Sequence, residues 1–201
     1  MRRALFIASL LFSLPMAAMA QETPNVEVFG GYSYFRTNAG RALSDDLHGW
    51  NASVAANLNR WFGLVVDVSG HYDSQSSASM IIQPGFPPIS FRFDLHRNIH
   101  TILVGPRFSY RKMEKITPFA HVLFGGARLH SETESNGIVD ISFSGNDTAF
   151  AAAAGGGLDV KLTKGIALRV IQAEYLLTRF GGQTQNNGRA SVGIVFRFGG
   201  K

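Results

Sequence analysis

Residues 189–198 read Arg-Ala-Ser-Val-Gly-Ile-Val-Phe-Arg-Phe. Apolar side chains occupy every even-numbered position of this stretch, and the odd-numbered positions are polar or glycine apart from Val195. A two-residue period is typical of a β-strand whose two faces lie in different surroundings. The same alternation recurs at 50–58 and 62–68. The sequence therefore predicts an all-β protein.

Eight segments fit this description, and we expect eight antiparallel strands. Their predicted ranges are 25–36, 47–58, 61–73, 97–110, 117–130, 148–162, 166–179 and 189–198. Three connections are short (59–60, 111–116 and 163–165), whereas those around 37–46, 74–96, 131–147 and 180–188 are long and rich in Ser, Asn, Gly and Pro. Short turns at one end and long loops at the other are typical of an outer-membrane barrel. An even strand number places both termini at the short-turn end, which we expect to be periplasmic.

The first twenty residues have the features of a cleavable signal peptide. Arg2 and Arg3 precede an apolar segment at 4–14, and Ala18-Met19-Ala20 fits an A-x-A cleavage site. The apolar segment is too short to span a membrane as a helix, and Pro15 interrupts it. We therefore expect a signal peptide at 1–20 and a barrel domain at 21–201.

Composition favours a transmembrane barrel over a soluble domain. Charged residues make up 16% of the chain, against roughly 25% in an ordinary soluble domain. After Ala20 no stretch is long and apolar enough for a spanning helix. The chain has no cysteine, so packing and hydrogen bonds must hold it together. The net charge is +5, but no block of like charges follows a nucleic-acid backbone, and we expect no nucleic-acid partner.

Alternation alone would also fit a soluble lipocalin-like barrel, in which the apolar face points inward. All five lysines, however, fall in or beside short turns or at the C-terminus: Lys112, Lys115, Lys161, Lys164 and Lys201. Aromatic residues lie near the predicted strand ends, where girdles form at membrane surfaces; they are Tyr32, Tyr34, Trp50, Trp61, Phe62, Phe108, Tyr110 and Phe198. We therefore expect the apolar face to contact outer-membrane lipids.

Three segments resemble those of the OmpA-like and OmpX-like small outer-membrane barrels: 26–34, 58–64 and 155–160. The last strand resembles the aromatic-ended strand that the outer-membrane assembly machinery recognises in this class. The resemblance implies that this machinery is a partner and that Phe196 and Phe198 form the assembly signal. Family members commonly end on the aromatic residue, whereas Gly199-Gly200-Lys201 follows here. The resemblance implies a fold more than a function, because these barrels do many things.

The predicted register points several charged residues into the lumen. An eight-stranded barrel is just wide enough to be filled by side chains. Buried charges of opposite sign must pair there, because a lone buried charge costs several kcal/mol. We therefore predict a lumen ion-pair network of Glu27, Asp67, Arg107, Asp159, Arg169, Glu174 and Arg197. The alternative use of these charges is a gated ion or proton path.

The seventh predicted strand contains an irregularity. Arg169 is odd-numbered, whereas Gln172 and Glu174 are even-numbered, yet all three are polar enough to be expected inside. All three face inward if one extra residue near Val170 or Ile171 forms a β-bulge. Otherwise Gln172 and Glu174 lie near the rim.

A lipid A-modifying enzyme is a further alternative, because some eight-stranded barrels have this activity. A deacylase would need a serine activated by a histidine. Ser69 and His71 share a parity, but the register points them into the lumen, where lipid cannot reach them. His96 and His100 lie about 13 Å apart along a strand. We expect no catalytic site, no metal site and no cofactor.

The remaining candidate for a function is the set of long loops. Residues 80–89, within the loop predicted at 74–96, are unusually apolar, and exposed apolar patches often mark contact sites. This segment could instead fold over the barrel mouth or extend the neighbouring strands. We expect a non-enzymatic outer-membrane protein with a structural or surface-interaction role, and a possible extracellular ligand at loops 74–96 and 131–147. The alternatives are a small gated pore and a lipid A-modifying enzyme.

Overall fold

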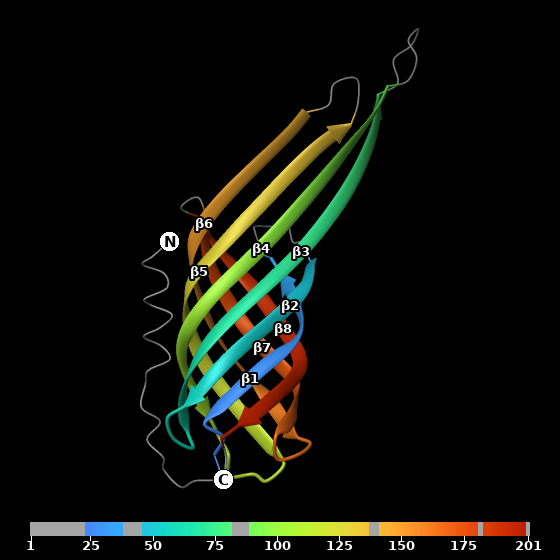
Figure 1. Ribbon diagram of the computed structural model, residues 1–201. Helices are drawn as coiled ribbons and strands as arrows, with labels where there is room; N and C mark the ends of the chain where they lie inside the picture. Colours follow the sequence, from blue (N-terminus) through green and yellow to red (C-terminus); the bar gives the residue numbers. More distant parts are fainter. Residues whose placement is uncertain (1–22, 38–45, 82–88, 137–140, 181–182, 200–201) are drawn as a thin grey trace, which may run out of the picture.

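The computed structural model describes residues 23–37, 46–81, 89–136, 141–180 and 183–199, and the predicted signal peptide lies outside them. The strands are β1 (Val26–Arg36), β2 (Asp46–Asn57), β3 (Phe62–Ile81), β4 (Ile89–Ser109), β5 (Ile116–Asn136), β6 (Ile141–Lys161), β7 (Ile166–Phe180) and β8 (Gln183–Phe198). They follow one another around a closed antiparallel barrel, in which β8 pairs with β1 (Figure 1). The predicted eight-stranded antiparallel barrel is confirmed.

The seam between β1 and β8 depends on two glycines. Gly31 pairs with Gly193, and a Cβ atom built on Gly31 would lie 2.0 Å from the carbonyl oxygen of Val192. No side chain fits at such a distance, so only glycine permits this close approach of the two backbones. The start of β1 and the end of β8 lie together at the short-turn end, where the backbone N–H of Asn25 donates to the carbonyl of Phe198 at 2.9 Å.

The two faces of the barrel wall differ as the alternation predicts. Odd-numbered side chains of β1 to β6 face inward and are mostly buried, including the polar Asn51 and Thr101. Even-numbered side chains face outward and are mostly apolar; Ile102 and Phe124 expose 64% and 49% of their surface. A barrel that exposes its large apolar side chains in this way is suited to lipid rather than water.

The irregularity predicted in β7 is a β-bulge. Arg169 pairs with Asp159, but the next partner on β6, Leu158, pairs with Ile171, which leaves Val170 as the extra residue. Val170 and Ile171 are both exposed on the outside of the barrel, and Gln172 is buried inside. The bulge therefore shifts the parity of β7 and brings Gln172 and Glu174 inward together with Arg169.

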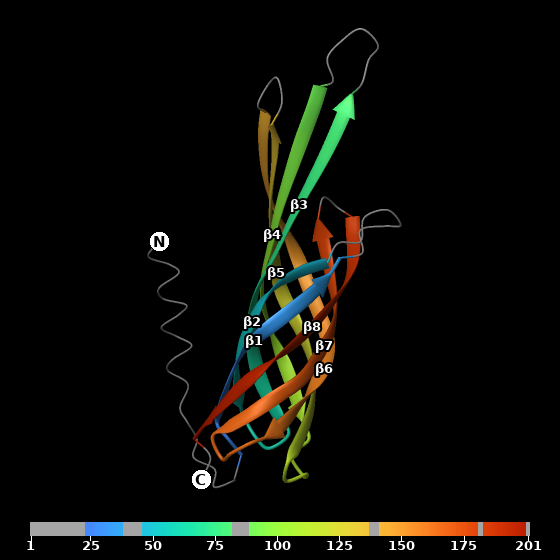
Figure 2. The ribbon, with the colours of Figure 1, turned by 90° about the vertical axis from the view of Figure 1, so that its right-hand side faces the viewer.

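The predicted loops at 74–96 and 131–147 are mostly strand, and this prediction was wrong. Residues 74–81 pair with 89–96 and residues 131–135 pair with 141–145, so β3 to β6 continue as two tall hairpins. The segment 180–188 is mostly strand as well. Figures 1 and 2 show β3, β4, β5 and β6 rising beyond the other strands. Of residues 80–89, Met80, Ile81 and Ile89 extend the two strands, as one alternative predicted. Residues 82–88 lie outside the described part, as do 38–45 and 137–140.

The outward face changes its chemistry along these four strands. One outward row across β3 to β6 is Val66, Val104, Phe124 and Ala152, which is entirely apolar. The outward row eight residues further along is Ser74, His96, Glu132 and Ser144, which is entirely polar. At about 3.3 Å per residue the two rows are about 26 Å apart along the strands. We call the part of β3–β6 from the polar row outward the protruding sheet.

Candidate functional site

The barrel lumen holds the main concentration of charged side chains in the described residues. One group, the Arg189 cluster, is centred on Arg189, whose side chain is fully buried. Its guanidinium donates to Glu174 at 2.6 and 2.8 Å, to Asp67 at 2.8 Å and to Ser69 at 3.0 Å. His121 lies 2.8 Å from Glu174 through Nε2. Two carboxylates are therefore held by one arginine and one histidine.

A second group, the Glu27 cluster, lies nearer the short-turn end. Its members are Glu27, Asp159, Arg107, Arg111, Arg169 and Arg197. Glu27 lies within 3.0–3.4 Å of nitrogen atoms of Arg107, Arg111 and Arg197. Asp159 accepts hydrogen bonds from Arg169 at 2.8 and 3.1 Å and from Arg107 at 3.3 Å. Each carboxylate thus forms ion pairs with more than one guanidinium group.

Two phenylalanine rings support these guanidinium groups. Arg107 and Arg169 lie 4.2 and 4.4 Å from the ring centroid of Phe119, and Arg169 lies 4.3 Å from that of Phe29. Planar guanidinium groups stack well on aromatic faces, and this contact is stronger away from water. The rings therefore hold the guanidinium groups of Arg107 and Arg169 in place within the cluster.

Gln172 joins the two clusters. It accepts a hydrogen bond from Arg169 Nη1 at 2.6 Å and donates through Nε2 to Glu174 at 3.0 Å. This position depends on the bulge at Val170, because a regular strand would turn Gln172 to the outside. The two clusters therefore form one continuous polar network along the lumen.

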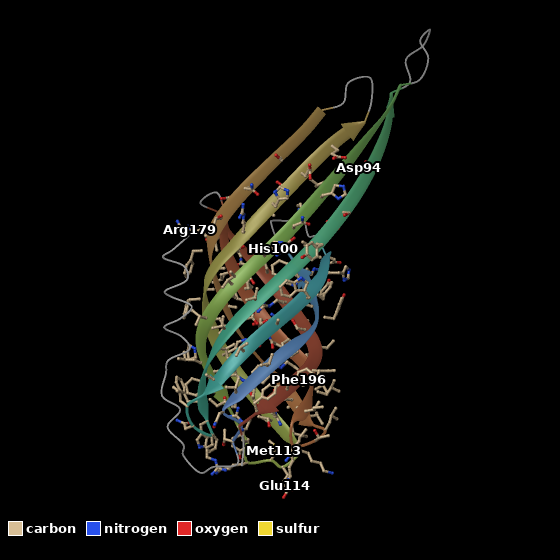
Figure 3. The ribbon with its side chains drawn as sticks, viewed as in Figure 1. Asp94, His100, Met113, Glu114, Arg179 and Phe196 are labelled. Carbon is tan, nitrogen blue, oxygen red and sulfur yellow. The ribbon has the colours of Figure 1, made fainter. Side chains whose placement is uncertain are left out.

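All seven residues of the predicted network lie inside the barrel, and the structure brings each into an ion pair with another charged side chain. The sequence reasoning left out Arg189, Arg111 and His121. The inward parity of Arg189 was visible, but Arg189 stood at the predicted start of its strand, and Arg111 stood in a predicted turn. The two predicted assembly residues, Phe196 and Phe198, lie on the outside and expose 45% and 55% of their surface (Figure 3 labels Phe196).

The lumen contains an apolar cluster toward the long-hairpin end. Phe35, Leu47, Ile99 and Leu176 are buried there within one hydrophobic cluster, and Leu129 packs against it. Phe35 and Leu47 are strand partners near the end of β1 and the start of β2. Asn187 and Thr178 are buried at the same end and form a hydrogen bond of 3.0 Å, so apolar and polar side chains are mixed in this part of the lumen.

The serine and histidine that lie closest in the lumen are not the pair considered from the sequence. His71 Nε2 lies 2.8 Å from Ser33 Oγ, whereas Ser69 contacts Thr101 and Arg189. His71 and Ser33 are fully buried, and His71 Nδ1 has no hydrogen-bond partner among the described residues. A catalytic histidine is normally oriented by a third group, which this pair lacks within the described part of the chain.

Among the described residues, no cluster contains three or more His, Asp or Glu side chains arranged to hold a metal ion.

Within the same residues, the chain forms no helix with the length and apolar character needed to cross a membrane.

Comparison with known proteins supports the fold. The barrel is similar to Ail, the attachment invasion locus protein of Yersinia pestis, whose structure was determined with the heparin analogue sucrose octasulfate. The TM-score is 0.60 and the sequence identity is 18%, over 88% of this chain and 99% of Ail. It is also similar to Neisserial surface protein A, with a TM-score of 0.52 at 12% identity over 87% of this chain and 97% of that protein. No curated protein matches the sequence significantly. The family described as outer membrane protein beta-barrel domain matches residues 4–198, and the chain therefore belongs to this family of outer-membrane barrels.

Proposed function

We propose that this chain is a non-enzymatic outer-membrane protein that binds a ligand at the cell surface through its protruding sheet. The observation that carries the proposal is the change of outward chemistry between the Val66 row and the Ser74 row. An apolar outward face fits lipid, and a polar outward face on the same strands fits water. Four strands thus present a polar surface beyond the membrane, in place of the flexible loops expected there.

The proposed orientation follows from this surface and from the short turns. The protruding sheet would face the extracellular medium, and the short turns with Lys112, Lys115 and Lys164 would face the periplasm, together with both chain ends. Figure 3 shows Asp94 on the protruding sheet and Glu114 at the opposite end of the molecule. Short periplasmic turns and longer extracellular segments are the usual arrangement in this class.

The charge of the protruding sheet bears on the kind of ligand. Its described charged side chains are Asp94, Glu132 and Glu134, and all three are acidic. Ail was solved with a polyanionic heparin analogue, but an acidic surface repels a polyanion. We therefore propose a protein ligand with basic or polar contacts, rather than a sulfated glycan.

The buried lumen supports a non-enzymatic role. A lipid-modifying site would have to meet lipid, whereas the Ser33–His71 pair is enclosed inside the barrel. Mass spectrometry of lipid A from cells with and without the protein tests this part of the proposal. A difference in acylation would identify an enzyme.

A gated pore is the second candidate, and the continuous polar network through Gln172 favours it. The buried apolar side chains of Phe35, Leu47 and Ile99 oppose it, because apolar groups in a narrow lumen hinder the passage of ions. Planar-bilayer conductance of the refolded protein separates the two functions. Steady single-channel currents would favour the pore over the binding role.

Two matched deletions test the binding role. One deletion joins Ser74 to His96, and the other joins Glu132 to Ser144, each through an Asn-Gly turn. The two residues of each pair are strand partners in one hairpin, and both pairs lie in the same outward row. Each deletion removes one hairpin of the protruding sheet beyond the row and leaves the register of the barrel strands intact. We expect cells carrying either deletion to bind less to surfaces coated with matrix proteins, while the barrel still shows its heat-dependent gel mobility. The proposal would be contradicted if cells with either deletion bound as well as wild-type cells. Strong binding of wild-type cells to immobilised heparin would contradict it too.

A further inference from the structure

The Glu27 cluster is not electrically balanced. Four arginines (Arg107, Arg111, Arg169 and Arg197) share two carboxylates, those of Glu27 and Asp159. The Arg189 cluster differs, because its two carboxylates face one arginine and one histidine. The excess positive charge is therefore local to the short-turn end of the lumen. A buried charge is costly in free energy when no opposite charge pairs with it.

Several guanidinium N–H groups in this cluster have no hydrogen-bond acceptor among the described residues. They are Nε and Nη2 of Arg197, Nε of Arg107 and Nε of Arg111, and all four atoms are buried. The side chains of Arg197, Arg107 and Arg111 expose 9%, 3% and 10% of their surface. Arg197 Nε lies 3.2 Å from Glu27 but without the alignment of a hydrogen bond, and the two Glu27 oxygens have no hydrogen-bond partner among the described residues either. Strong donors in a planar fork are the groups that bind oxyanions in proteins.

Glu27, Arg107 and Asp159 each have a large strand partner on one side, namely Arg197, His121 and Arg169, and a small one on the other. Ala55 pairs with Glu27, Gly63 pairs with Arg107 and Thr117 pairs with Asp159, and all three face the lumen. Phe119 stacks on Arg107, and Phe29 and Phe119 stack on Arg169. Arg111 and Arg197 make no such ring contact among the described residues, so an anion would approach the cluster from their side.

Access to this site is from the short-turn end. The arginines nearest the opening, Arg111 and Arg197, are three to five times as exposed as Arg107 and Arg169. The turns around the opening add exposed positive charge at Arg60, Lys112, Lys115, Lys161 and Lys164, against Glu114. Such a field raises the local concentration of anions. We propose that Arg197, Arg107 and Arg111 bind a phosphate-like oxyanion at this end of the lumen.

The ligand chemistry is that of a phosphate group, which free phosphate or a phospholipid headgroup at the rim would supply. The mature barrel refolded in maltoside micelles, which carry no phosphate, tests free inorganic phosphate. The same protein in phosphatidylglycerol vesicles tests the headgroup. Line broadening in the ³¹P spectrum of inorganic phosphate reports binding directly, and the urea midpoint of tryptophan fluorescence at constant ionic strength reports the linked stabilisation. Stabilisation by phosphate in micelles assigns the free anion, and stabilisation by the charged lipid alone assigns the headgroup.

Two variants with opposite expectations test the residues. Arg197→Gln removes one charged donor and should weaken phosphate binding about tenfold, the size of one charged hydrogen bond. Glu27→Gln removes a competing carboxylate and should tighten binding severalfold, although it removes ion pairs. Arg60→Gln is the control, because Arg60 gives Arg111 only its backbone carbonyl and is one of five exposed cations around the opening. It should weaken binding far less than Arg197→Gln.

The opposite directions keep the proposal testable if Arg197→Gln does not fold. A simple ion-pair network predicts that Glu27→Gln destabilises the barrel and gains no affinity for phosphate. Unchanged or weaker binding by Glu27→Gln would overturn the proposal. So would equal binding by wild type, Arg197→Gln and Arg60→Gln, or the absence of binding in both micelles and vesicles.

Discussion

Arg189 of β8 and Glu174 of β7 form a bidentate ion pair, with the guanidinium donating to the carboxylate at 2.6 and 2.8 Å, and both side chains are buried. Arg189 also reaches Asp67 of β3, on the other side of the lumen, at 2.8 Å. One arginine therefore links three strands, of which β3 is not a neighbour of β8. This geometry predicts a large effect of removing it.

We expect Arg189→Met to lower the free energy of unfolding by about 3–5 kcal/mol, because it removes the arginine that pairs with two buried carboxylates. Equilibrium urea unfolding in lipid vesicles, followed by tryptophan fluorescence, gives this value. Arg179→Met is the matched control, because Arg179 is exposed near the end of β7, and it should change stability little. Equal stability of the two variants would mean that the Arg189 cluster contributes no net stability.

The position at which the protruding sheet leaves the membrane can be tested with two outward residues of the same strand. Val66 and Ser74 share a face of β3, eight residues apart. Val66→Arg should cost about 2–4 kcal/mol, the cost of an arginine on the lipid face near the midplane, whereas Ser74→Arg should be close to neutral. The same unfolding measurement compares them. Similar costs would place both residues in one medium and contradict the boundary between the two rows.

The strands within the membrane were predictable from the sequence because lipid imposes one polarity on every outward position. The tall hairpins were not, because that constraint ends at the membrane surface. At residues 74–79 the sequence Ser-Gln-Ser-Ser-Ala-Ser has no apolar alternation and looks like a loop. Its strand structure comes from pairing with 91–96, which a local pattern does not contain.

The site shows the same division between local and distant information. The bulge at Val170 was predictable, because charge parity changes within one strand. The partner of Asp67 was not, because Arg189 lies 122 residues away on a strand that does not neighbour β3. Contacts across the lumen depend on the closed cross-section of the barrel, whereas the alternation reports only which face a residue occupies.

The orientation in the membrane can be tested by cysteine labelling, because the chain has no native cysteine. Ser144→Cys places a thiol on the protruding sheet, and Glu114→Cys places one in a short turn. A membrane-impermeant maleimide added to intact cells should label Ser144→Cys and leave Glu114→Cys unlabelled until the outer membrane is permeabilised. Labelling of Glu114→Cys alone in intact cells would reverse the proposed topology.

The last prediction concerns assembly, which the folded barrel does not itself explain. Phe198 lies outward beside Val26 at the closing seam, and its exposed ring stabilises the finished barrel only modestly. During insertion, however, β8 is an unpaired edge until it meets β1, and an edge strand is a natural recognition element. Removing residues 199–201 should therefore change little, whereas removing Phe198 as well should lower the outer-membrane level severalfold and leave protein in the periplasm. The ratio of membrane to periplasmic protein for the two truncations measures this effect. Phe198→Tyr keeps an aromatic ring at the same position and should give the wild-type ratio, which separates recognition of the ring from strand length. Equal ratios for both truncations would show that Phe198 carries no assembly signal.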